Sequence, residues 1–134
     1  MLTVTISDQL GNQMFAYASV KTIAQNRDES FGFVRAKNNL INDTDKQYGN
    51  EIHTIFPNTR AEFLTELPTA ITHTWEEPPL RERTANYQPS ALTVPENTLM
   101  KGHFISCQYF WENRSKVQKW FSFPEEMELA VKME

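Results

Sequence analysis

One short segment near the start of the chain combines residue types that bind oxygen-rich ligands. Gly11, Asn12 and Gln13 stand in a row between a predicted strand, residues 2–6, and a predicted helix, residues 14–25. The N–H groups in the first turn of a helix are unpaired and partially positive, so they bind anions readily. Gly11 allows a ligand to approach the backbone closely, Asn12 is a favoured N-cap residue, and Gln13 adds amide donors and an acceptor. The segment therefore predicts either a ligand site or a capped turn that holds no ligand.

A second pair of candidates lies in the C-terminal third of the chain. His103 is near the end of a predicted strand, residues 98–106, and Ser106 borders the loop that follows. A histidine at that place can titrate near neutral pH or contact a sugar, and the alternative is an ordinary hydrogen-bonded strand histidine. Beside Ser106, Cys107 has no neighbouring base that would lower its pKa, so we expect an unreactive thiol. His103 and Ser106 are retained as predicted binding residues.

No catalytic residue can be assigned from the sequence. The weak candidates for a general base are His73, His103, Glu76 and Asp8. Glu76 and Glu77 precede two prolines, a pattern more typical of a solvated loop than of a paired acid and base. The three histidines lack the spacing of a metal-binding motif, so we predict no metal and no resident cofactor.

Three tryptophans offer flat surfaces on which a sugar ring can stack. Trp120 lies at helical spacing with other apolar residues, which favours a position in the core. Trp111 is equally consistent with a surface position and with a buried one. Trp75 falls within a segment predicted to be a strand, residues 70–77.

The elements that must position these residues predict an α/β domain. Residues 2–6 are rich in β-branched side chains and carry no charge, as in a buried strand, and residues 14–25 are apolar nearly all round in their first half. A further strand is predicted at residues 30–34. A strand, a helix and a strand in this order form a βαβ unit, which implies a parallel pair.

The remainder of the chain is predicted with less regular structure. Five prolines between residues 68 and 95 exclude long elements there. The expected elements are helical turns at residues 60–67, strands at 70–77 and 98–106, and helices at 109–123 and 125–134.

Composition sets the class of protein. The chain has 134 residues, the size of one domain, of which 40% are hydrophobic and 12% aromatic, so a core is available. The formal net charge is −4, with mixed charges and no basic stripe, which argues against nucleic-acid binding. A single cysteine and the lack of a long apolar run predict a cytoplasmic protein. Peripheral contact of this cytoplasmic protein with the inner face of a membrane is the alternative location.

Two stretches of the sequence are similar to one enzyme family. "LGNQMFAYA", residues 10–18, resembles the Gly-Gly-Leu-Gly-Asn-Gln-Met-Phe-Gln-Tyr-Ala motif of the α-1,2-fucosyltransferases of glycosyltransferase family eleven. "VPENTLMKGHFISCQYF", residues 94–110, followed by "FSFPEE", residues 121–126, resembles a second conserved segment of that family. The two matches occur in the family's order. Asp8 and Gln9 replace the family's two leading glycines.

The resemblance implies a Rossmann-like domain with a parallel sheet core, corresponding to the N-terminal, acceptor-side domain of a type B glycosyltransferase, over residues 1–134. It implies transfer of fucose from GDP-fucose to a galactoside, with Gly11, Asn12, Gln13, His103 and Ser106 binding donor or acceptor. The family's donor-binding motif, His-x-Arg-x-Gly-Asp, does not occur in this sequence. We therefore expect a chain without the donor-binding domain and with little activity alone.

The resemblance also sets the expected partners. These are a galactoside or oligosaccharide acceptor, and either a downstream donor-binding domain or another copy of the chain. The alternative function is a non-catalytic glycan-binding or assembly module that kept the fold.

Overall fold

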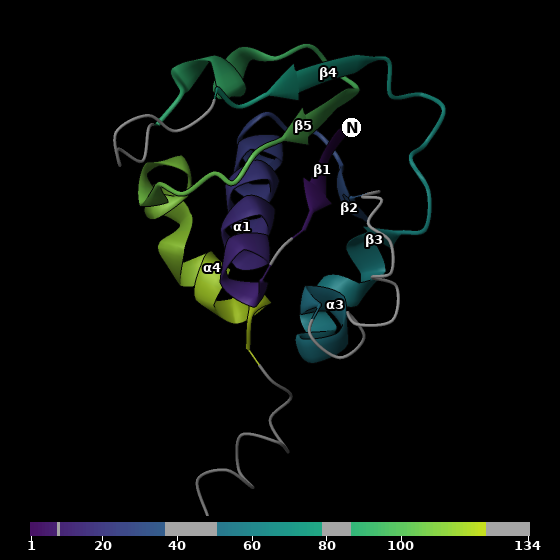
Figure 1. The fold of residues 1–134 in the computed structure, drawn as a ribbon. Coiled ribbons are helices and arrows are strands. Elements are labelled where there is room, and N and C mark those ends of the chain that lie inside the picture. The colour runs from purple at the N-terminus through teal and green to yellow at the C-terminus, as the bar shows by residue number, and fades with distance from the viewer. Residues whose placement is uncertain (8, 37–50, 79–86, 123–134) are drawn as a thin grey trace, which may run out of the picture.

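The computed structural model describes residues 1–7, 9–36, 51–78 and 87–122, and its centre is a five-stranded sheet in which every neighbouring pair of strands is parallel. The strand order is β3-β2-β1-β5-β4. The strands are β1 (Leu2–Ile6), β2 (Phe31–Arg35), β3 (Phe63–Leu64), β4 (His73–Glu76) and β5 (Thr98–Lys101). With helices packed on this sheet, the fold is α/β and Rossmann-like (Figure 1).

The predicted βαβ unit is confirmed. Strand β1 leads into helix α1 (Leu10–Asn26), which returns the chain to β2 as a parallel neighbour of β1. The helix begins four residues earlier than predicted, because Leu10 already packs against the hydrophobic core. Gln9 is therefore the N-cap residue, and its side chain makes no capping bond. The prediction of Asn12 as the N-cap is wrong, since Asn12 lies inside the first turn.

One row of apolar side chains crosses the sheet from edge to edge and faces α1. The strand registers place Phe63 beside Phe33, Phe33 beside Val4, and Val4 beside Met100, with Trp75 beside Met100. Val4, Phe33 and Met100 are fully buried, and all five side chains belong to or pack against a single core cluster. Period-two alternation sends the intervening residues to the opposite face of the sheet.

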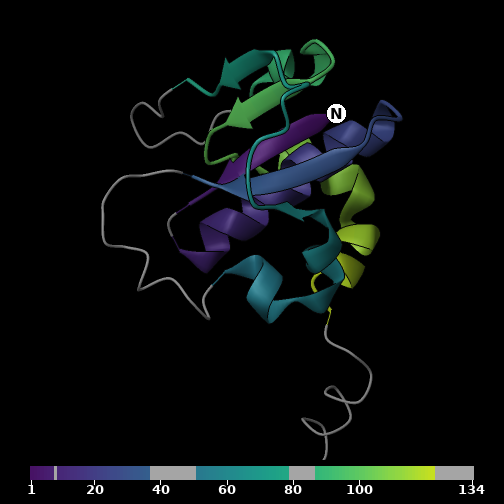
Figure 2. The ribbon, with the colours of Figure 1, turned by 90° about the vertical axis from the view of Figure 1, so that its right-hand side faces the viewer.

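The two faces of the sheet are covered differently. Helices α1 and α4 (Arg114–Trp120) lie on one side, and the connection from β3 to β4, residues 65–72, runs along the other (Figures 1 and 2). On that second face, Gly32 sits beneath Leu64. A Cβ added at Gly32 would lie 2.7 Å from Leu64 Cδ1, so a side chain there would displace Leu64.

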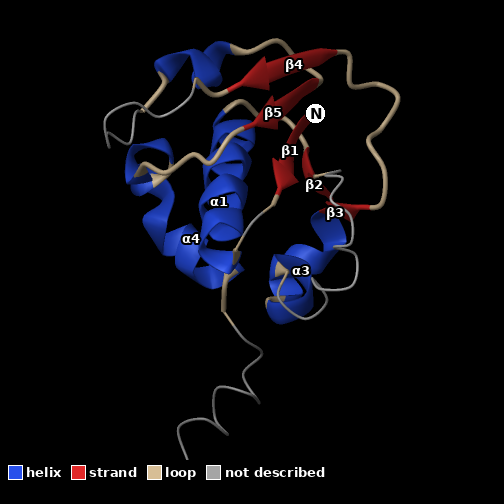
Figure 3. Cartoon of the chain, viewed as in Figure 1, coloured by secondary structure: helices blue, strands red, loops and turns tan. Residues whose placement is uncertain are grey.

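The remaining elements are short helices that join or cover the strands (Figure 3). They are α3 (Ile52–Ile55), η1 (Pro57–Glu62), η2 (Pro89–Thr93), η3 (Cys107–Tyr109) and η4 (Trp111–Asn113). The helical region predicted at residues 109–123 is broken into η3, η4 and α4. The helix predicted at 125–134 lies outside the described residues. Within the described part of the chain, no helix has the length and apolar character needed to cross a membrane.

Two predicted elements are corrected in part by the structure. Of the helical turns predicted at residues 60–67, the first three residues belong to η1, whereas Phe63 and Leu64 form strand β3 because they pair with β2, a contact that local sequence does not encode. The strand predicted at 98–106 ends at Lys101. The chain then turns, and Phe104, three residues later, adopts a positive φ of 52°, which a regular strand does not contain. The strand predicted at 70–77 is confirmed for the part that forms β4.

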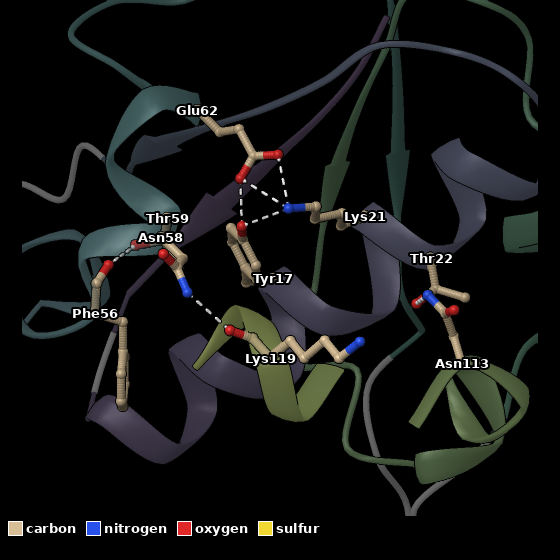
Figure 4. Close-up of polar contacts among 9 residues, drawn as sticks. All are labelled: Tyr17, Lys21, Thr22, Phe56, Asn58, Thr59, Glu62, Asn113 and Lys119. Atoms are coloured by element: carbon tan, nitrogen blue, oxygen red, sulfur yellow. Dashed lines mark hydrogen bonds and ion pairs between the residues drawn. The ribbon is translucent and has the colours of Figure 1, made fainter. Parts of the chain in front are cut away.

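A buried polar cluster joins α1 to the elements around it (Figure 4). The Tyr17 hydroxyl donates to Glu62 at the end of η1, and Lys21 Nζ lies 2.9 Å from both the Tyr17 hydroxyl and Glu62 Oε2. The Lys21 ammonium also lies 4.4 Å from the ring centroid of Trp120 in α4. Burial, together with the Glu62 carboxylate, raises the pKa of Tyr17. Two elements, η1 and α4, are thus fastened to one point on α1.

Candidate functional site

The structure brings the five predicted binding residues to the same edge of the sheet. Gly11, Asn12 and Gln13 follow β1, whereas His103 and Ser106 follow β5, and β1 and β5 are parallel neighbours. Their carboxyl ends therefore meet at one edge. The chain runs outward from β1 through β2 to β3 on one side, and β4 and β5 lie on the other, so the strand order reverses between β1 and β5. Open α/β sheets bind ligands at this place.

Gly11 is an exposed position in the first turn of α1. A Cβ added there would have no protein atom within 4 Å, and Gly11 does not require a positive φ. Neither packing nor backbone geometry therefore explains a glycine at this position. Asn12, the next residue, is half-buried.

Gln13 has a structural partner inside the protein. Its side chain is only 5% exposed, and its Oε1 accepts a hydrogen bond of 3.1 Å from the backbone N–H of Ile52, the first residue of α3. The N-cap of α3, Glu51, makes no side-chain capping bond, so Gln13 supplies the acceptor from a distant element. A role for Gln13 in ligand binding stays a prediction.

The Glu77 carboxylate organises the segment that carries His103. Glu77 Oε1 accepts hydrogen bonds of 3.0 Å from the backbone N–H groups of both His103 and Phe104, and its Oε2 accepts one of 3.2 Å from the Tyr109 hydroxyl. Gly102 passes so close that an added Cβ would lie 2.5 Å from Glu77 Cβ. Glu77 is thus a clamp on the turn after β5. The sequence pattern predicted a solvated acid and missed this role.

His103 and Ser106 differ in how the structure uses them. The His103 side chain is exposed at the edge of the sheet. Ser106 caps η3, and its Oγ accepts from the backbone N–H of Gln108 at 3.3 Å. The same hydroxyl lies 3.5 Å from Gln108 Oε1. Ser106 therefore positions the segment that begins at Cys107.

A paired arginine also lies at this edge. Arg35, the last residue of β2, donates to both carboxylate oxygens of Glu51 at 2.7 and 2.6 Å. This bidentate pair holds the start of α3 against the end of β2. Near it, His53 stacks on Phe63 with ring centroids 3.8 Å apart. Burial lowers the pKa of His53.

The weaker catalytic candidates do not converge. His73 begins β4 and so lies at the amino edge of the sheet, away from the predicted site. Glu76 is exposed and alternates with Trp75, which faces the core, so it projects from the other face. Asp8 lies outside the described residues. Across the described ranges, no three His, Cys, Asp or Glu side chains gather as they would around a metal ion.

The three tryptophans have separate environments. Trp120 packs against the core, as predicted, and so does Trp75, whose ring centroid lies 5.8 Å from that of Phe104. Trp111 is 55% exposed. Of the three, Trp111 therefore offers the largest accessible ring.

Comparison with protein-family models, with curated proteins and with solved structures finds no match to this chain.

Proposed function

We propose that this chain is an acceptor-side domain of the α-1,2-fucosyltransferase kind, which holds a galactoside and the sugar-diphosphate end of GDP-fucose at the carboxyl edge of its sheet. One observation carries the proposal. The two segments that resemble the fucosyltransferase family are far apart in sequence, but residues 10–18 follow β1 and residues 94–110 contain its parallel neighbour β5.

The edge has the chemistry for an oxygen-rich ligand. Helix α1 has 17 residues, and the N–H groups of its first turn have no intrahelical acceptor. Together with the helix dipole they favour a phosphate or a sugar hydroxyl near Gly11. Because no protein atom lies near the absent Cβ of Gly11, a ligand can reach the backbone there.

A substitution at Gly11 tests the site without disturbing the fold. Gly11→Ala adds a methyl group into open space, and alanine is favoured over glycine in a helix by about 0.5–1 kcal/mol, so stability should be retained or increased. If a ligand contacts the backbone at this turn, the methyl group should weaken GDP-fucose or lactose binding at least roughly tenfold, or about 1.4 kcal/mol. Isothermal titration calorimetry measures the effect. Gln25→Ala, an exposed change at the far end of α1, is the matched control.

Two results would contradict this proposal. One is a native chain that binds neither GDP, GDP-fucose nor lactose. The other is a Gly11→Ala variant whose affinity equals that of the native chain and of Gln25→Ala.

The alternative is a glycan-binding or assembly module without catalysis. The contacts of three polar side chains near the edge favour it, because these contacts stabilise the fold itself. Gln13 bonds to α3, Glu77 clamps the turn after β5, and Arg35 pairs with Glu51. A transfer assay with GDP-fucose and lactose separates the two functions. We expect no useful turnover from this chain alone, since the sequence contains no Arg-x-Gly-Asp to stabilise the leaving diphosphate. Galactoside binding without nucleotide binding would favour the module.

A further inference from the structure

A shallow surface groove, open to solvent and about 530 Å³ in volume, lies on the segment that follows β5, and none of the five predicted binding residues lines it. Its lining comes from η3, from η4 and from a tyrosine two residues before η2: Tyr87, Cys107, Gln108, Trp111 and Glu112. We call it the Trp111 groove.

The position of the Trp111 ring is set by its neighbour. The Arg114 guanidinium lies 4.4 Å from the ring centroid and donates a 2.9 Å hydrogen bond to the Trp111 carbonyl oxygen. This cation–π contact and hydrogen bond hold the indole in place although more than half of its surface is exposed. Tryptophan rings are enriched where proteins bind ligands and partners.

The rim of the groove is polar but not cationic. Gln108 contributes an amide that can donate and accept, and its orientation is steadied by Ser106, whose Oγ lies 3.5 Å from Gln108 Oε1. Glu112 contributes a carboxylate, which accepts hydrogen bonds but repels phosphate and other anions. The guanidinium of Arg114 is already stacked on Trp111. This combination disfavours nucleotides and favours a neutral ligand with many hydroxyl groups.

We propose that the Trp111 groove binds a neutral hexose ring, with the apolar face of the sugar on the indole and its hydroxyl groups bonded to Gln108 and Glu112. A pyranose has apolar C–H faces and a polar rim, which match the aromatic wall and the amide and carboxylate of this groove. The proposal rests on the proposed function only for the choice of a galactoside as the first sugar to test. Its residues are distinct from those at the edge of the sheet.

The groove contains its own reporter. Cys107 is the sole cysteine of the chain, is exposed, and lines the cavity, so its alkylation rate measures access to the groove. Because no neighbouring base activates this thiol, the intact chain is alkylated with excess iodoacetamide at alkaline pH, where the thiolate forms. Lactose, maltose or GDP is present at about 100 mM, which detects millimolar binding. We expect either sugar to slow alkylation at least about threefold and GDP to have no effect. In Trp111→Ala, the protection by sugar should disappear.

Two further variants keep the test sharp. Trp111→Phe retains a ring and should retain part of the protection. Leu92→Ala removes another exposed apolar side chain, on η2, and should protect as the native chain does. Because Trp111 is largely exposed, its replacement should leave the unfolding midpoint nearly unchanged, which thermal denaturation checks.

The outcomes are separable from those for the edge site. Sugar protection that depends on Trp111 but not on Gly11 supports the groove even if GDP-fucose does not bind at the edge. The inference is overturned by equal alkylation rates with and without sugar, by protection that persists in Trp111→Ala, or by protection from GDP alone.

Discussion

Replacement of Glu77 should loosen the turn that carries His103. Glu77→Ala removes the acceptor of two backbone N–H groups, at His103 and Phe104, and of the Tyr109 hydroxyl. The His103 N–H is exposed and can turn to water, whereas the Phe104 N–H and the Tyr109 hydroxyl are partly buried. Each buried group left without a partner costs about 1–3 kcal/mol, or about 2–6 kcal/mol for two. Because both groups are only partly buried, we expect a loss in the lower part of that range, about 2–3 kcal/mol in the free energy of unfolding.

Backbone conformation adds to this effect. Phe104 has a positive φ of 52°, a conformation that costs a bulky residue of the order of 1–3 kcal/mol and persists only where surrounding contacts impose it. Without Glu77, the turn should relax. Glu77→Gln keeps an acceptor oxygen at the same place and should lose only about 1 kcal/mol.

Urea denaturation and amide hydrogen exchange test this reasoning together. Denaturation reports the free energy of unfolding, and exchange at Phe104 should accelerate in Glu77→Ala by more than the global loss of stability explains. Glu76→Ala is the matched control, since Glu76 is the exposed residue directly before Glu77, at the end of β4, and it should stay within about 0.5 kcal/mol of the native chain. Equal stability of the Glu77→Ala and Glu76→Ala variants, with unchanged exchange at Phe104, would refute the clamp.

Two further predictions concern buried ionisable groups. Burial lowers the pKa of His53 below 6.5, so its neutral form stabilises the fold above that pH, and this stabilisation is lost as pH falls below 6.5 toward the folded-state pKa. His53→Phe should keep the stacking on Phe63 and lose less stability between pH 7.5 and 5.5, as measured by thermal unfolding; equal losses would contradict the assignment. Lys21→Met should cost about 2–4 kcal/mol, because it leaves the Glu62 carboxylate without its cation at a largely buried site. The double variant Lys21→Met/Glu62→Leu should recover part of that loss in urea denaturation, and a double variant less stable than the single one would argue against an uncompensated charge.

The part of the fold that could be read from the sequence is the part built from local contacts. Apolar residues of β1, α1 and β2 follow one another with clear periodicity, and their order implies the parallel pair that the structure contains. Strand β3 could not be read in this way. It has two residues and takes its conformation from pairing with β2, which lies far away in the sequence.

In the candidate site too, features encoded locally could be predicted from the sequence, and features set by long-range contacts could not. The residue types in the segments after β1 and β5 indicated oxygen-rich ligands, and the resemblance to fucosyltransferases joined the two segments. The roles of Gln13 and Glu77 could not be inferred, because Gln13 bonds to α3 across 39 positions of sequence and Glu77 to the turn after β5 across 26 or more. The spacing of Tyr17 and Lys21, four residues apart on one helix, was the available signal for the buried cluster.

By itself, the sequence determined the elements whose stability depends on side-chain periodicity and backbone preference: a parallel βαβ start, the helix within it although not its first turn, and an aromatic-rich region toward the C-terminus. Only the tertiary structure decided which polar groups hold the protein together and which remain at its surface. The physical reason is that a buried amide or carboxylate must find a partner, and the nearest one in space is often distant in sequence. Folding therefore directs Gln13 and Glu77 inward and leaves Gly11, His103 and Trp111 exposed to solvent.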